Sequence, residues 1–121
     1  MSDDPQSYNR KDLQRFYADL VLVHGWQHLT PLLNVLDALL KLREERGLFT
    51  FTSHELLTFT SHPEYPAWAN DDIVAIEPLR SGKAEVHYVR RREPCSEESV
   101  VVGYDTLIST VDAMLSRLSP A

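Results

Sequence analysis

Residues 73–105, IVAIEPLRSGKAEVHYVRRREPCSEESVVVGYD, carry the strongest indication of the fold class. Short polar turns separate three runs rich in β-branched and aromatic residues, at 73–77, 84–91 and 99–104. The middle run alternates between two faces, with Val86 and Tyr88 on one and Glu85, His87 and Val89 on the other. This is the period of a β-strand, and connections this short join antiparallel neighbours. We therefore expect a three-stranded antiparallel meander.

The segment after the third run predicts a helix. Asp105 is a favourable N-cap residue. Apolar residues then recur at helical spacing: Leu107, Ile108, Val111, Met114, Leu115 and Leu118. Because a three-stranded sheet needs a cover, we expect this C-terminal helix to pack on one face of the meander.

The N-terminal part of the chain predicts two more helices. The first covers about residues 10–24 and ends at Gly25, a residue suited to a helix C-terminus. The second begins at the N-cap Thr30 with Pro31 in its first position, and it ends at Gly47. Residues 1–8 are expected to be a flexible lead-in, and residues 9–121 a single α+β domain.

Residues 48–70 support two interpretations. Thr52 and Glu55 match a capping box, which favours a short third helix over residues 54–60. The alternative is two short strands, because Phe51 and Phe59 lie among β-favouring threonines. We favour the helix. The predicted fold is then α+β: two N-terminal helices, a short third helix, a three-stranded antiparallel meander, and a C-terminal helix packed on the sheet.

Charge and composition narrow the classes of partner. The formal net charge is −6, so phosphate backbones and anionic lipids are repelled, and we expect neither nucleic-acid nor membrane binding. A basic protein partner suits this charge better. The single cysteine, Cys95, cannot form an intramolecular disulfide, and neither a signal peptide nor a bilayer-length apolar stretch is recognisable. We therefore expect a cytoplasmic protein.

Catalytic and cofactor motifs are missing from the sequence. Its four glycines form no phosphate-binding loop and no nucleophile elbow. His24 and His28 are four residues apart, which on a continuous helix would suit a metal ion. Gly25 and the Thr30 cap break that helix, so these histidines are weak candidates. We expect no cofactor and favour a non-enzymatic role.

The aromatic and acidic segment around residues 65–72 is the predicted partner-binding surface. Tyr65 and Trp68 are typical interface anchors, and Asp71 and Asp72 would attract a basic partner. The alternative for Trp68 is a packed position in the core. The leading hypothesis is a small acidic protein-binding module. In size, charge and architecture it resembles the small acidic α+β proteins that act as inhibitors or immunity partners.

Two other functions stay open. One is a metal- or small-molecule-binding domain, enzymatic or not, with a cleft lined by His24, His28, His87 and Tyr88. The other is a structural subunit that self-associates through its sheet edge or through an apolar helix face.

Overall fold

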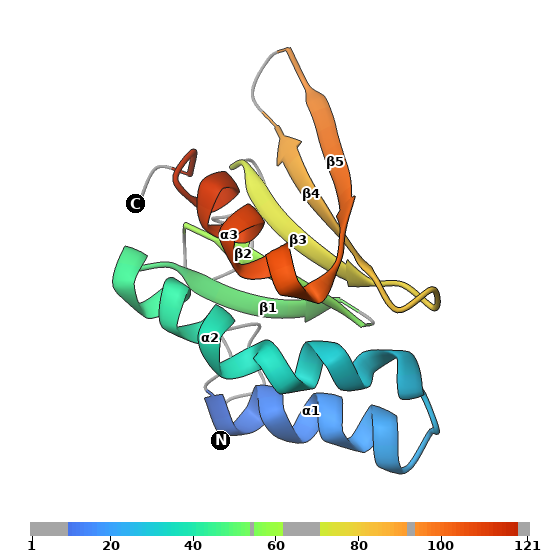
Figure 1. Cartoon of the computed structure of the whole chain (residues 1–121). Helices are drawn as coiled ribbons and strands as arrows, with labels where there is room; N and C mark the ends of the chain where they lie inside the picture. The colour runs from blue at the N-terminus through green and yellow to red at the C-terminus, as the bar shows by residue number, and fades with distance from the viewer. Residues whose placement is uncertain (1–9, 54, 62–70, 92–93, 119–121) are drawn as a thin grey trace.

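The computed structural model describes residues 10–53, 55–61, 71–91 and 94–118. This part of the chain begins with two helices that lie side by side (Figure 1). Helix α1 is Arg10–Leu22, and α2 is Thr30–Arg46, with the short 3-10 helix η1, Gln27–Leu29, between them. As predicted, α2 ends before Gly47, whose φ of 65° lies in the left-handed region that glycine adopts without strain. The cap of α2 is Leu29 rather than Thr30, with Pro31 still in the first turn.

A five-stranded antiparallel sheet follows, and its strands are ordered along the sheet as they are along the chain. The strands are β1 (Phe49–Ser53), β2 (Leu56–Thr60), β3 (Ile73–Pro78), β4 (Ala84–Arg90) and β5 (Ser96–Val102). Helix α3, Tyr104–Leu115, closes the described chain. Its cap is Gly103, so the predicted cap Asp105 lies in the first turn, where its charge complements the helix dipole.

The α+β class is confirmed, but the short third helix is wrong and two strands are missing from the prediction. Residues 56–60 form β2, which pairs with β1 on one side and β3 on the other. The alternation of Leu57 and Phe59, both fully buried, with threonines is the period of a strand. The capping-box pattern is a local preference, and pairing on both sides overrides it. The predicted lead-in, residues 1–8, lies outside the described residues.

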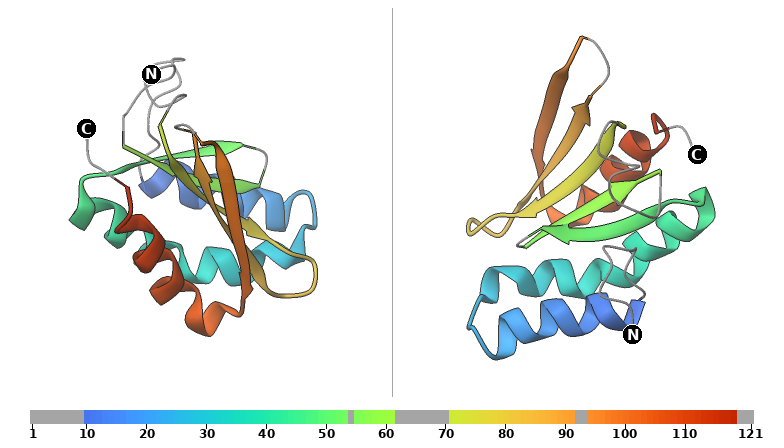
Figure 2. Two further views of the ribbon diagram at one scale, coloured as in Figure 1. Left: turned by 90° about the horizontal axis from the view of Figure 1, so that it is seen from above. Right: turned by 180° about the vertical axis from the view of Figure 1, so that it is seen from behind.

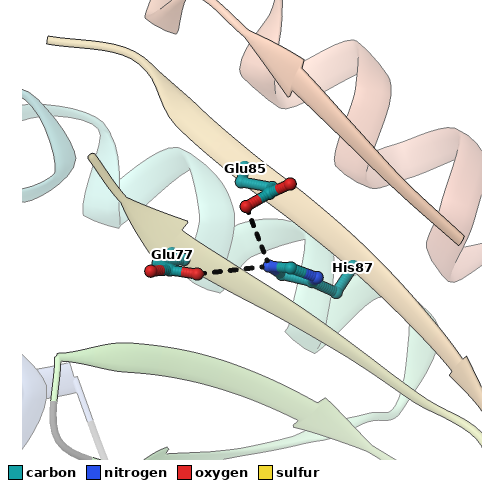
Figure 3. A group of neighbouring side chains, drawn as sticks. All are labelled: Glu77, Glu85 and His87. Atoms are coloured by element: carbon teal, nitrogen blue, oxygen red, sulfur yellow. Dashed lines mark hydrogen bonds and ion pairs between the residues drawn. The ribbon is translucent and has the colours of Figure 1, made fainter. Parts of the chain in front are cut away.

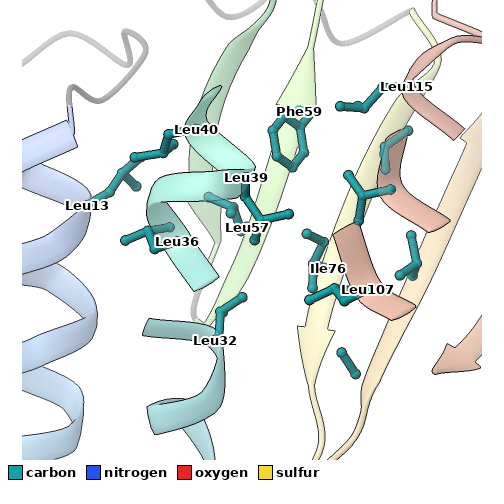
Figure 4. Packing of buried hydrophobic residues seen from close by; sticks show 14 of the residues in the cluster. Leu13, Leu32, Leu36, Leu39, Leu40, Leu57, Phe59, Ile76, Leu107 and Leu115 are labelled. Carbon is teal, nitrogen blue, oxygen red and sulfur yellow. The ribbon is translucent and has the colours of Figure 1, made fainter. Parts of the chain in front are cut away.

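The hydrophobic core lies between one face of the sheet and helices α2 and α3, and it extends to α1 through Leu13 and Tyr17 (Figure 4). Sheet residues Leu57, Phe59 and Ile76 meet Leu39 and Leu107 from the helices. Arg46 of α2 is also joined to Asp112 of α3 by an ion pair of 2.6 Å. In the view from behind, the strands lie in front of α3 and show the face of the sheet that is opposite α3 (Figure 2). No helix among the described residues is long and apolar enough to cross a membrane.

Candidate functional site

The sheet face opposite α3 carries a group of acidic residues around one histidine (Figure 3). Strand alternation places it there: Ile76 and Val86 point into the core, so their neighbours point away from it. Glu77 of β3 lies directly across from Glu85 of β4, and His87 is on the same face two residues further along β4. We call Glu77, Glu85 and His87 the Glu–His cluster.

The atoms of the Glu–His cluster converge on one ring nitrogen. His87 Nε2 lies 3.4 Å from Glu77 Oε1 and 3.6 Å from Glu85 Oε1. One ligand atom from each of the three residues lies within 4.8 Å of the other two. The side chains are 19%, 39% and 27% exposed for His87, Glu77 and Glu85. The cluster is therefore sheltered but reachable from solvent.

The cross-strand pairing of Glu77 with Glu85 is unfavourable for the stability of the fold. Like charges directly opposite each other in a sheet destabilise it. Departures from local stability rules are expected at functional sites. A positive charge held between the two carboxylates would remove this repulsion.

The spacing of the cluster suits a tetrahedral metal ion. Bonds of about 2.1 Å to nitrogen and oxygen place two ligand atoms of a tetrahedral site about 3.4 Å apart. The two distances from Nε2 agree with this value, and the third edge, between the carboxylate oxygens, is within 4.8 Å. They are long for ordinary hydrogen bonds, which centre near 2.9 Å.

The second ring nitrogen of His87 faces another carboxylate. Nδ1 lies 3.3 Å from Oε1 of Glu97 on β5. Nδ1 is buried and makes no well-aligned hydrogen bond within the described residues, although this carboxylate is close. Metal-binding histidines usually donate their other ring N–H to a carboxylate, which leaves the ligating nitrogen unprotonated. A rotation of the mostly exposed Glu97 side chain would align that bond.

The cluster opens onto a groove of about 420 Å³ across β2 to β5. Its wall contains the apolar residues Leu56, Ile73, Ala75 and Val89, and Thr58. Arg91 also lines it. Such an apolar lining with a few convergent polar groups is typical of small-ligand sites.

The predicted partner-binding residues are only partly described. Tyr65 and Trp68 lie outside the described residues. Asp71 is half-buried. Asp72 is 9% exposed, and its carboxylate accepts hydrogen bonds from the Tyr88 hydroxyl at 2.8 Å and the Arg91 backbone N–H at 3.0 Å. Its contact with a partner stays a prediction, and its observed role is to join the start of β3 to the end of β4.

His24 and His28, the other two histidines among the described residues, are not part of the Glu–His cluster. His24 and His28 each pack against Trp26, with ring centroids 6.4 and 6.2 Å away. His28 lines a second hollow with Trp26, and Glu77 of the Glu–His cluster lines this hollow as well. Tyr88 points into the core, while its neighbour His87 faces the groove. The four residues expected to line one cleft therefore do not share one: His28 and His87 line two hollows that have Glu77 in common, and His24 and Tyr88 line neither of them.

Neither Glu77 nor Glu85 is among the site residues predicted from the sequence, although a signal is present. The Ser81-Gly82 turn makes a hairpin, and the hairpin register brings Glu77 opposite Glu85. Alternation then places His87 on the same face as Glu85.

No protein-family model, curated protein or solved structure matches the chain. Its candidate function therefore follows from its own side chains.

Proposed function

We propose that this protein binds a divalent transition-metal ion through Glu77, Glu85 and His87. The observation that carries the proposal is the pair of distances from His87 Nε2, 3.4 and 3.6 Å, to one oxygen of each carboxylate. These separations are the edges of a tetrahedral site with bonds of about 2.1 Å. The ion would enter between side chains that already surround its position.

The ligand set favours a particular class of metal. One imidazole with two carboxylates suits Zn²⁺ and its neighbours, whereas Mg²⁺ prefers an all-oxygen octahedron. The ion would also neutralise the repulsion between Glu77 and Glu85. Glu97 would hold the His87 ring with Nε2 free to bind the metal.

Three protein ligands leave the fourth tetrahedral position open. Catalytic zinc sites share this feature, whereas structural sites are usually closed by four protein ligands. Here the open position would face the groove lined by Ile73, Val89 and Arg91. A small ligand in that groove could therefore contact the ion and the apolar wall together.

Calorimetric titration of the full chain with Zn²⁺ tests the proposal. We expect one site per chain, loss of binding in His87→Ala, and unchanged binding in the control His24→Ala, which removes an exposed histidine that lines neither hollow. The control also tests the histidine pair singled out in the sequence. Absence of zinc binding in the wild type, or binding that survives His87→Ala, contradicts the proposal.

The protein-binding function inferred from the sequence stays a prediction. Of its four residues, Tyr65 and Trp68 are outside the described part, and Asp72 is engaged with Tyr88. Capture of a partner by the wild type that is lost in Trp68→Ala would support that prediction.

A further inference from the structure

Strand β5 forms an exposed border of the sheet (Figures 1 and 2). Within the described part of the chain it pairs with β4 alone. Residues 96–101 are all exposed, and Val100 and Val101 keep 39% and 49% of their surface accessible. The opposite border differs, because Thr50 and Phe51 of β1 are buried. Proteins usually protect such an edge, since its free backbone groups pair readily with another strand.

The negative charges of the β5 glutamates do not require a basic partner protein. The Arg117 guanidinium lies 2.5 Å from the Glu98 carboxylate, and their hydrogen bond holds the pKa of Glu98 below its usual range. Glu97 faces a ring nitrogen of His87. The acidic end of the strand is therefore already matched by groups of the same chain.

We infer that β5 pairs antiparallel with β5 of a second copy, about a two-fold axis at Ser99. The residue pairs would be Ser99 with Ser99, Glu98 with Val100, Glu97 with Val101, and Ser96 with Val102. This is the antiparallel register in which all seven residues of β5 are paired. It places every glutamate opposite a valine and no glutamate opposite a glutamate.

The two neighbouring two-fold registers are less favourable. With the axis at Val100, Ser96 and Glu97 would have no partner within β5. With the axis at Glu98, the two Glu98 side chains would face each other, and like charges in that position destabilise a sheet. With the axis at Ser99, paired residues share a face, so two five-stranded sheets continue into one. Val100 and Val101 of both copies would then be covered.

Sedimentation of the full chain in the presence of a chelator tests the self-association. We expect a concentration-dependent shift from the 13.9 kDa chain to twice that mass. A matched pair of substitutions at one position reports the register. Val100→Glu would place a glutamate opposite Glu98 of the second copy and abolish the dimer, whereas Val100→Lys would retain or strengthen it. Thermal unfolding of both variants confirms that they fold.

Cysteine cross-linking tests the axis directly in a Cys95→Ser background. Opposite residues in an antiparallel pair have Cα atoms about 4.5–5.5 Å apart, within the range that a disulfide spans. Ser99→Cys should therefore form a covalent dimer under a mild oxidant. Val101→Cys, which is also exposed, should not, because the two copies of residue 101 lie about 13 Å apart along the strands.

Several outcomes would overturn the inference. They are a wild type that stays monomeric at all concentrations, a dimer that the chelator dissolves, equal effects of Val100→Glu and Val100→Lys, and equal cross-linking at residues 99 and 101. Capture of a foreign strand by a monomeric wild type would also count against self-pairing. Apart from the effect of the chelator, these outcomes are measured without metal and so do not depend on the proposed metal site.

Discussion

Replacing Glu85 by glutamine is expected to stabilise the metal-free protein while weakening its binding of zinc. Glu85 lies directly across from Glu77, and a cross-strand charge pair changes stability by about 0.2–1 kcal/mol. Both side chains are partly exposed, at 27% and 39%, so solvent screening favours a mid-range value of about 0.5 kcal/mol. For a chain of this length the Tm should rise by about 2 °C.

Zinc should reverse the order of stability. At a zinc concentration 100 times the wild-type Kd, binding to the folded state alone contributes about 2.7 kcal/mol, or about 10 °C in Tm. Loss of one carboxylate ligand should raise the Kd at least about 10-fold. The contribution in Glu85→Gln then falls to about 1.4 kcal/mol at most, or about 5 °C. The variant is therefore more stable than the wild type without zinc and less stable with it.

Thermal unfolding at pH 8, where imidazole is ordinarily neutral, measures both effects. Each protein is unfolded once in chelator and once in zinc. The control for zinc binding is Glu45→Gln, which removes an exposed glutamate from α2 and should leave the zinc-induced rise in Tm unchanged. A lower Tm of Glu85→Gln in chelator would refute the repulsion, and a full zinc shift would refute the ligand assignment.

Four further predictions concern other groups. Glu97→Gln should leave the zinc stoichiometry at one in calorimetry but weaken the affinity about 10-fold, because Glu97 contacts His87 Nδ1 rather than the ion; unchanged affinity would remove Glu97 from the site. Tyr17→Phe should lower the free energy of unfolding by about 1 kcal/mol in urea, since the Tyr17 hydroxyl donates to the Glu55 carbonyl at 3.1 Å. Tyr104→Phe should be neutral or stabilising, because the Tyr104 hydroxyl is buried and has no hydrogen-bond partner among the described residues. Burial, helped by the charge of Glu55, raises the pKa of Tyr17, and burial raises the pKa of Tyr104 to about 12. The folded protein therefore holds these protons when the unfolded chain begins to lose them near pH 10, so stability should fall above that pH. The fall should be about 1.4 kcal/mol per pH unit for the buried Tyr17 and smaller for Tyr104, which is partly exposed to solvent. Urea titrations between pH 9 and 11 would show this slope, and an equal slope in Tyr17→Phe would exclude Tyr17 as a source.

The accuracy of the sequence-based fold depends on how distinctive each local pattern is. In β4 the alternation of Val86 and Tyr88 with more polar residues has no helical equivalent, so the meander is predictable. In residues 49–60 a capping-box pattern competes with threonine-rich strand propensity, and both are local. Pairing of Leu57 with Ile76, nineteen positions later in the chain, settles that competition.

Some residues of the candidate site can likewise be predicted from local sequence patterns, whereas others depend on long-range pairing. The hairpin turn and the alternation of β4 place Glu77, Glu85 and His87 on one face, and both features can be read from the sequence. Glu97 joins them because β5 pairs with β4 in a particular register, which the sequence between these strands does not specify. Asp72 is predicted as a surface contact because an aspartate is usually exposed.

Residue chemistry and short-range spacing act without the rest of the molecule. They determine the order in which helices and strands follow along the chain, the helix end at Gly47 and the two faces of β4. Three other features follow from long-range contacts. They are the strand identity of residues 56–60, the burial of Asp72 beneath Tyr88, and the approach of Glu97 to His87. Each depends on which distant segment packs alongside, and many arrangements share the same local preferences until the sheet register selects one.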